Sequence, residues 1–266
     1  MKTAYRWLAV MVAGTLVMAP SGLPSATATA PEKALLGGGA GIEFDGNNLC
    51  TLTTIGHNKT GELIGFTSAH CGGPGVSVVA EGAEDRGDVG TVVAVDADLD
   101  YAVIKFDPAK VTPTSNFDGF AINGIGPDPP QLHTPCVESR ADGHAPTGHV
   151  CVDVTYPEQF QMSCQQSRAT GRTCADIIGP GRDPATLNAH ECANPDDSGA
   201  PVTVNDLLIG MVRGGFIPGI PCPVPSPFPG VAFFPVAAQP EVVSINAIIA
   251  NAAKGGPGVG FVPVSS

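Results

Sequence analysis

Cys-Ala-Asn-Pro-Asp-Asp-Ser-Gly-Ala-Pro, residues 192–201, is the stretch that decides how this chain is interpreted. Its Asp-Ser-Gly centre is flanked by small residues and by proline. Such a sequence suits a nucleophilic serine on a tight turn, because glycine and alanine let the backbone approach a substrate closely and the preceding acid can hold the turn. The stretch therefore marks Ser198 as a candidate nucleophile and Asp197 as the acid that holds its turn. An isolated Asp-Ser-Gly would also fit an ordinary surface turn.

A candidate base lies upstream, in Thr67-Ser68-Ala69-His70-Cys71. His70 follows a predicted strand, and a general base needs both a pKa near the working pH and a fixed orientation. A disulfide on the next residue, Cys71, would help to fix it. A lone histidine is usually structural, so the interpretation depends on the serine stretch further along the chain.

The candidate orienting acid is Asp100, in Leu99-Asp100-Tyr101-Ala102-Val103-Ile104. The apolar run that follows places this carboxylate at the mouth of a buried strand, where a histidine N–H can satisfy it. Asp96 and Asp98 are rival acids, although both fit a solvated turn. The chain thus presents a base, an acid and a nucleophile in the order His, Asp, Ser.

The N-terminus is typical of a secretory signal. Two basic residues lie within the first six positions, residues 7–19 are uncharged, and Ala26-Thr27-Ala28 is a cleavage motif. We expect cleavage after Ala28, with Ala30 as the alternative. A membrane anchor is the competing interpretation, but the apolar run is short for a bilayer span. No later segment is expected to cross a membrane, so the mature protein is expected to be secreted.

The composition favours one all-β domain with two lobes. About 240 residues remain after the leader, with 34 Gly and 26 Pro in the whole chain and 14% charged residues. Such a chain favours many short strands joined by turns. The net charge is −12, and nearer −14 once Lys2 and Arg6 leave with the leader. An acidic chain without a basic cluster argues against a nucleic-acid partner.

Periodicity and turn residues divide the chain into four parts. The leader is residues 1–28, the first β lobe is 29–120, the second lobe is 121–254, and 255–266 is expected to be a flexible tail. In the second lobe, Val242, Ile245 and Ile249 fall at helical spacing after Pro240 and predict a C-terminal helix. Predicted strands are Leu49–Ile55, Leu63–Thr67, Val76–Ala80, Val89–Val95, Tyr101–Phe106, Val150–Val154, Leu207–Val212 and Gly230–Val236.

Eight cysteines in an exported chain indicate disulfides. For Cys136 and Cys151 the alternative to a disulfide is a zinc site, which they would form with His144 and His149. Its residue types fit zinc, but the irregular spacing and the oxidising destination favour a loop disulfide. No metal is therefore expected.

These blocks resemble the secreted bacterial chymotrypsin-fold serine proteases, of the streptogrisin and alpha-lytic branch. The likeness covers most of residues 36–250, while the loops between the blocks diverge. The matching blocks are Cys50–Cys71, Leu99–Ile104, Cys164–Cys174 with Thr170-Gly171, Pro195–Pro201, Gly214-Gly215 and Phe233–Val236.

The resemblance implies a fold of two antiparallel six-stranded β-barrels with a C-terminal helix. It implies a serine endopeptidase without cofactor, acting on peptide or protein substrates; the oligomeric state stays open. The implied catalytic residues are His70, Asp100 and Ser198, with an oxyanion hole from the N–H groups of Asp196 and Ser198. The implied substrate pocket is lined by Arg213, Gly214 and Gly215.

The resemblance also implies a disulfide pattern. Cys50 is expected to pair with Cys71, since it lies on the preceding strand of a hairpin. The family blocks imply the pairs Cys164–Cys174 and Cys192–Cys222, which leaves Cys136–Cys151.

Three departures from the family pattern bear on activity. Asp196 replaces a glycine that donates an oxyanion N–H, Ala200 replaces a second glycine, and Arg213 replaces a small serine. Arg213 could neutralise Asp196 or Asp100, or recognise an acidic substrate side chain. The family's long folding pro-region is also not expected, because Cys50 comes soon after the leader. A protease-fold domain that only binds is therefore the alternative function; a disulfide-rich structural module with a chance triad is a third.

Overall fold

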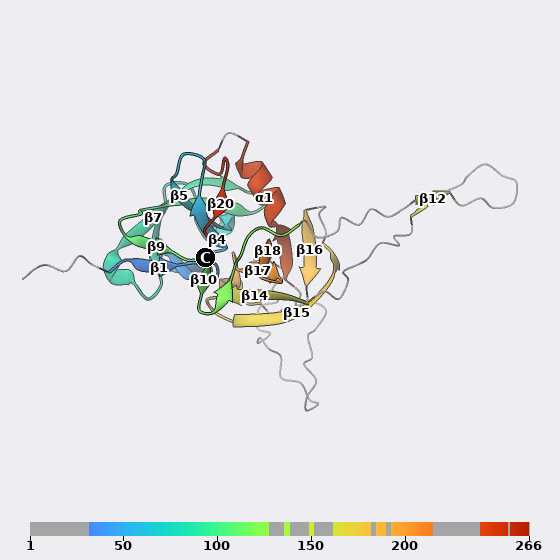
Figure 1. Ribbon diagram of the computed structural model, residues 1–266, viewed down its shortest axis with the longest axis horizontal. Coiled ribbons are helices and arrows are strands. Elements are labelled where there is room, and N and C mark those ends of the chain that lie inside the picture. Colours follow the sequence, from blue (N-terminus) through green and yellow to red (C-terminus); the bar gives the residue numbers. More distant parts are fainter. Residues whose placement is uncertain are drawn as a thin grey trace, which may run out of the picture. The chain divides into compact units, whose positions relative to one another are not determined.

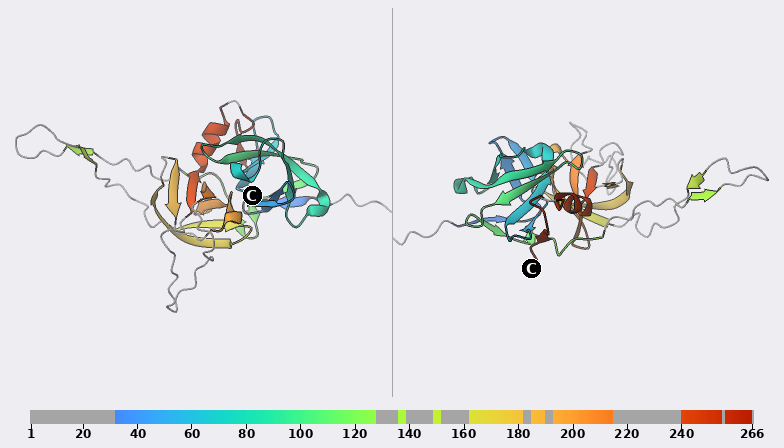
Figure 2. Two further views of the ribbon diagram at one scale, coloured as in Figure 1. Left: turned by 180° about the vertical axis from the view of Figure 1, so that it is seen from behind. Right: turned by 90° about the horizontal axis from the view of Figure 1, so that it is seen from above.

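Short strands, most of them paired antiparallel, are the main secondary structure of the described chain. The computed structural model describes residues 32–127, 136–138, 149–151, 162–181, 185–189, 193–214, 240–254 and 256–265. Figure 1 shows the first sheet mainly in blue to green and a closed barrel in yellow to orange, and two further views are given in Figure 2. Several sequence predictions lie outside the described residues: the leader 1–28, Cys192, Gly215, Cys222 and strand 230–236.

The first sheet has the order β20-β4-β5-β8-β7-β6-β2-β3. Strands β3 and β4 are separated by only Leu52 and Thr53, yet they lie near opposite ends of this order, so the sheet must curl toward closure. The sequence predicted one strand over 49–55; the chain divides there because the Leu52 N–H donates to Ala40 while the Thr53 N–H donates to Phe66. The strands are β2 Gly41–Phe44, β3 Asn48–Thr51, β4 Thr54–His57, β5 Leu63–Ser68, β6 Ser77–Ala80, β7 Asp88–Asp96, β8 Tyr101–Phe106 and β20 Val262–Pro263.

The second sheet is a closed six-stranded barrel, β14-β15-β16-β19-β18-β17. The predicted all-β architecture with two curled antiparallel sheets and one helix is confirmed, although the first sheet has eight strands in place of six. Both sheets belong to one compact unit, Glu32–Ser266. The barrel strands are β14 Met162–Ser167, β15 Gly171–Pro180, β16 Thr186–Ala189, β17 Pro201–Val204, β18 Leu207–Gly214 and β19 Glu241–Ser244.

Short elements complete the described chain. Strands β1 and β9 pair in parallel, and β10–β11 and β12–β13 are antiparallel pairs. Within the described ranges, no helix is long and apolar enough to cross a membrane. These elements are β1 Ala34–Leu36, β9 Val111–Pro113, β10 Asn116–Phe117, β11 Phe120–Ala121, β12 Cys136–Glu138, β13 His149–Cys151, the helix α1 Ile245–Ala252, and the 3₁₀ turns η1 Ala69–Cys71, η2 Glu84–Arg86 and η3 Pro195–Asp197.

One apolar cluster contains residues from both sheets and from α1, which also contacts β18 and β19 (Figure 2). Phe66 and Tyr101 from the first sheet pack in this cluster with Met211 from the barrel and Ile248 from the helix. The Tyr101 hydroxyl also donates to the Asn251 side chain over 3.2 Å. Because Tyr101 follows Asp100 directly, this cluster fixes the start of strand β8, the strand that comes immediately after the candidate acid.

The C-terminal residues differ from the prediction in two ways. Val242 lies on strand β19, where it completes the barrel, and the helix begins only at Ile245, with the Ser244 hydroxyl accepting from the Ala247 N–H. The expected flexible tail instead adds strand β20 to β4. The cause is apolar: the Phe261 ring is buried and meets the Phe66 ring edge-on at 4.9 Å.

Truncating this ring tests the role of the C-terminal segment. Phe261→Ala should lower the free energy of unfolding by about 3 kcal/mol, because a buried aromatic is replaced by a cavity. The neighbouring Val262→Ala serves as a control, since Val262 is 64% exposed. Denaturant unfolding followed by circular dichroism measures both. Equal stability of the two variants would show that the segment is not part of the cooperative fold.

The predicted disulfides Cys50–Cys71 and Cys164–Cys174 are present in the structure. Cys136 and Cys151 are direct partners in the register of β12 and β13. His144 of the alternative zinc set lies outside the described residues.

Peptide mapping of the unreduced protein should therefore recover four crosslinks. Two are those of the structure, and the other two are Cys136–Cys151 and Cys192–Cys222. Mass spectrometry after proteolysis without reductant identifies each crosslinked pair. Any peptide that joins Cys192 to a cysteine other than Cys222 would contradict the pattern.

Candidate active site

His70 is held by its neighbours in the chain. Strand β5 ends at Ser68, and His70 lies in the single turn η1 that follows. The next residue, Cys71, is tied to Cys50 by a disulfide, and its carbonyl accepts from the Asn48 side chain over 2.6 Å. The backbone on the C-terminal side of His70 is thus fixed at two points, while its side chain is 48% exposed and free to meet a substrate.

Asp100 contacts His70 through both carboxylate oxygens. Oδ2 lies 2.8 Å from the imidazole Nδ1, and Oδ1 accepts from the His70 backbone N–H over 3.1 Å. The Asp100 backbone has a positive φ of 51°, in the left-handed region that aspartate tolerates better than most residues. The Ala69 N–H donates to the Asp100 carbonyl over 3.0 Å. The two-point contact fixes the orientation of the imidazole.

The rival acids have other contacts. The Asp96 carboxylate accepts from the Leu99 N–H over 2.8 Å and so holds the turn before Asp100. The Asp98 carbonyl accepts from the Arg213 guanidinium over 3.1 Å. Of the three acids, Asp100 is the one whose carboxylate meets His70.

The turn that carries Ser198 is anchored by the buried Asp197. Its carboxylate accepts from the Asn194 N–H over 2.6 Å and from the Thr170 N–H over 3.1 Å, and it is also bonded to the Thr170 hydroxyl. Asn194 and Asp197 form a reciprocal capping box around the 3₁₀ turn η3. A fully buried carboxylate would be costly without such donors, so the turn can bury Asp197 only because Asn194 and Thr170 supply them.

Gly199 allows the turn of residues 195–199, here called the nucleophile turn after its candidate nucleophile Ser198, to lie directly against the first sheet. Its φ is +88°, and an added Cβ would overlap the Thr51 carbonyl and the Thr67 hydroxyl. The Thr53 hydroxyl donates to the Gly199 carbonyl over 2.6 Å, and the Thr51 N–H donates to the Ser198 carbonyl over 2.9 Å. Only glycine satisfies both the backbone angle and the close approach.

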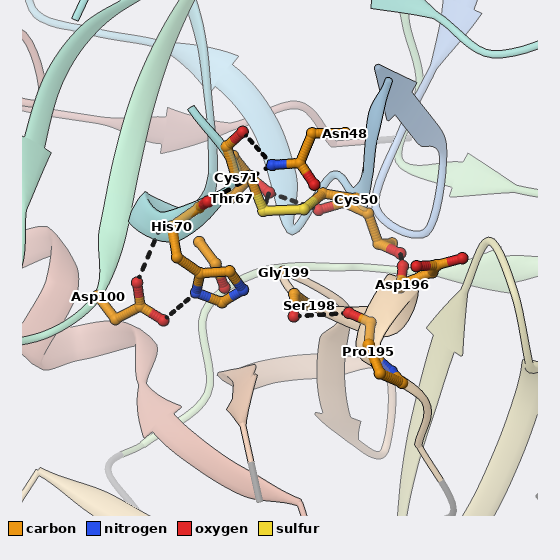
Figure 3. The surroundings of a disulfide bond; sticks show 12 residues. Asn48, Cys50, Thr67, His70, Cys71, Asp100, Pro195, Asp196, Ser198 and Gly199 are labelled. Atoms are coloured by element: carbon orange, nitrogen blue, oxygen red, sulfur yellow. Dashed lines mark hydrogen bonds and ion pairs between the residues drawn. A yellow bond between two sulfur atoms is a disulfide. The ribbon is translucent and has the colours of Figure 1, made fainter. Parts of the chain in front are cut away.

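Both hydrogen-bond donors of Ser198 point to the same carbonyl. The hydroxyl donates to Pro195 over 2.8 Å and the backbone N–H donates to it over 3.2 Å. Figure 3 shows the imidazole of His70 bonded to Asp100 through one nitrogen, with Ser198 beyond its other edge. Within the described residues, the Ser198 hydroxyl is therefore bonded within its own turn and not to His70.

Asp196 pairs with an arginine that the sequence did not suggest. Its carboxylate lies 3.1 Å from Arg168, whereas Arg213 forms an ion pair with Glu241 at 3.2 Å. Of the three roles suggested for Arg213, the neutralisation of Asp196 is therefore wrong. Arg168 lies in the predicted disulfide loop, but nothing in the local sequence signals a partner 28 residues away. Gly214, of the predicted substrate pocket, is the last residue of strand β18.

The charged groups around Arg168 shift each other's pKa. The hydrogen bonds between Arg168 and Glu81 lower the pKa of the Glu81 carboxyl and raise the pKa of the Arg168 guanidinium. Both groups are therefore charged at neutral pH.

Comparisons with known proteins support the fold. No protein-family model matches the sequence, and a search of curated proteins gives no significant match. Among solved structures, the alpha-lytic protease homolog N4 aligns with a TM-score of 0.55 at 17% identity, over 86% of this chain and 99% of that chain. Thermobifida fusca Protease A gives 0.53 at 18%, over 88% and 100%, and Cellulomonas bogoriensis chymotrypsin gives 0.50 at 16%, over 88% and 100%. The chain therefore has the fold of the bacterial chymotrypsin-like serine proteases.

Proposed function

We propose that this protein is a secreted serine endopeptidase that acts through an acyl-enzyme. The observation that carries the proposal is the two-point contact between Asp100 and His70, on a protease fold that brings the Ser198 turn beside the first sheet. Peptides or proteins are the proposed substrates. The leader and the disulfides Cys50–Cys71 and Cys164–Cys174 support export.

Each residue has a defined role in the proposed reaction. Asp100 keeps the proton on Nδ1 of His70, which leaves Nε2 free to accept the proton of the Ser198 hydroxyl. The Ser198 oxygen attacks the peptide carbonyl, and His70 then delivers the proton to the leaving amine. Water, deprotonated by the same imidazole, attacks the acyl ester; the bond to the Ser198 oxygen breaks, the carboxylic-acid product leaves, and His70 returns the proton to Ser198.

Two small rearrangements precede this chemistry. The Ser198 hydroxyl must rotate from the Pro195 carbonyl toward His70, as catalytic hydrogen bonds often form only once substrate is bound. The Pro195 carbonyl must also turn away from the Ser198 N–H. The N–H groups of Asp196 and Ser198 then become available to the developing oxyanion.

The proposed substrate pocket is lined by Arg213 and Gly214, the last two residues of strand β18, and by Gly215, which lies outside the described residues. The Arg213 guanidinium is held by Glu241 and by the Asp98 carbonyl. It thereby joins the barrel to the turn that precedes the candidate acid. This pairing offsets its charge, which favours neutral over strongly acidic side chains in the pocket.

A binding domain without catalysis is the second candidate. It is favoured by the Pro195 carbonyl, which engages both donors of Ser198 and would occupy the oxyanion position. A fluorophosphonate probe separates the two functions, because it reacts only with an activated serine. We expect labelling of the full secreted protein at Ser198; absence of labelling would favour the binding domain.

Substitutions at the three candidate residues should separate their roles. Ser198→Ala and His70→Ala should each abolish labelling and ester hydrolysis. Asp100→Asn should reduce kcat by about 10⁴-fold, because the amide favours the wrong histidine tautomer. The matched control is Asp98→Asn, whose side chain does not contact His70, and it should retain the parent rate. An equal loss in Asp98→Asn would show that the acid is wrongly assigned.

A further inference from the structure

The side chain of Asp196 poses an electrostatic problem for the proposed reaction. It lies two residues before Ser198, on the turn whose N–H groups are proposed to stabilise the oxyanion. Catalysis there requires positive potential, and a free carboxylate would oppose the developing charge. The Asp196 side chain is 55% exposed. Some other group must offset its charge if Ser198 is to react.

Arg168 meets this carboxylate with one edge of its guanidinium. Nη1 lies 3.1 Å from the Asp196 Oδ2 atom. The remaining nitrogens, Nε and Nη2, bind both carboxylate oxygens of Glu81, at 2.7 and 2.5 Å. Glu81 follows strand β6 of the first sheet, whereas Arg168 follows strand β14 of the barrel. The guanidinium is therefore fixed by a two-point ion pair from one sheet while it contacts the nucleophile turn of the other.

The surrounding backbone is built to hold this arrangement. A Cβ at Gly41 would overlap the Glu81 carboxylate, so strand β2 leaves room for it. The Arg168 N–H donates to the Thr51 hydroxyl over 3.2 Å. Thr51 also donates its own N–H to the Ser198 carbonyl over 2.9 Å. One buried threonine thus links the backbones of the arginine and of the nucleophile, and the Arg168 side chain is only 14% exposed.

We propose that Arg168 is a positioning residue for Ser198, which draws the Asp196 carboxylate away from the oxyanion site and offsets its charge. Glu81 fixes the arginine for this task. The inference rests on the proposed function, because it concerns the rate of reaction at Ser198. It accounts for an acid at a position where the related proteases are expected to carry glycine.

A double-mutant cycle on the full secreted protein tests the proposal. Arg168→Gln should lower kcat for a small ester by about fivefold to tenfold, with KM within about twofold, because a partly buried charge-assisted hydrogen bond contributes at this level. In the Asp196→Gly background the same change should alter kcat by less than about twofold, because no carboxylate remains to be offset. Arg168→Lys keeps the charge and should recover part of the loss.

Lys105→Gln is the control, since it breaks an ion pair of the same length, 2.5 Å to Glu62, elsewhere on the first sheet. It should leave kcat unchanged. Equal losses from Arg168→Gln with and without Asp196 would overturn the proposal and indicate a purely structural arginine. If Arg168→Gln does not fold, the cycle is run with Arg168→Lys, which should lose activity only when Asp196 is present. If neither the parent nor Asp196→Gly is labelled by fluorophosphonate at Ser198, the proposed function itself fails.

Discussion

A serine on one sheet can react with the help of a histidine on another only if the two sheets are held in a fixed relation. Here buried threonines provide much of that relation. Thr51 and Thr53 bind the carbonyls of Ser198 and Gly199, and the Thr67 hydroxyl donates to the Thr51 carbonyl over 2.8 Å. A buried N–H or hydroxyl donor left without a partner costs about 1–3 kcal/mol, so each of these bonds favours this one arrangement. The turn that carries Ser198 is thus held from two sides, by these threonines and by its own barrel, where the Gly199 N–H donates to the Val212 carbonyl over 2.8 Å.

The position of Ser198 depends on the contact between its turn and Thr51. Because Gly199 allows the close approach to Thr51, the turn can lie beside His70, and because Asp197 is satisfied by Thr170 and Asn194, the turn keeps its shape. The imidazole is oriented separately, by Asp100. The proposed chemistry therefore depends on two rigid halves, each fixed by buried polar contacts, with only the Ser198 hydroxyl and the Pro195 peptide left to rearrange.

Local sequence predicted the parts of this site that local interactions determine. His70 beside a disulfide, Asp100 before an apolar strand and Ser198 in a glycine turn each carry their signal within a few residues. The ion pair of Asp196 has no such local signal, because its partner Arg168 is 28 residues away and Glu81, which holds that arginine, is 87 residues from it. The prediction chose Arg213, the more conspicuous departure from the family pattern. A long side chain can reach several acids, and only the packed fold determines which one it meets.

The C-terminal segment is a second place where contacts distant in the sequence decide the structure. An end rich in glycine and proline is typical of a flexible tail, and this composition gave little reason to expect a strand. A single aromatic residue overrides that tendency: Phe261 enters the cluster shared by both sheets, and β20 then forms because the backbone of β4 offers unpaired partners. Tyr101 lies in the same cluster, directly after Asp100. The C-terminal segment thus supports strand β8, which begins directly after the candidate acid, and stability and proposed catalysis share one apolar core.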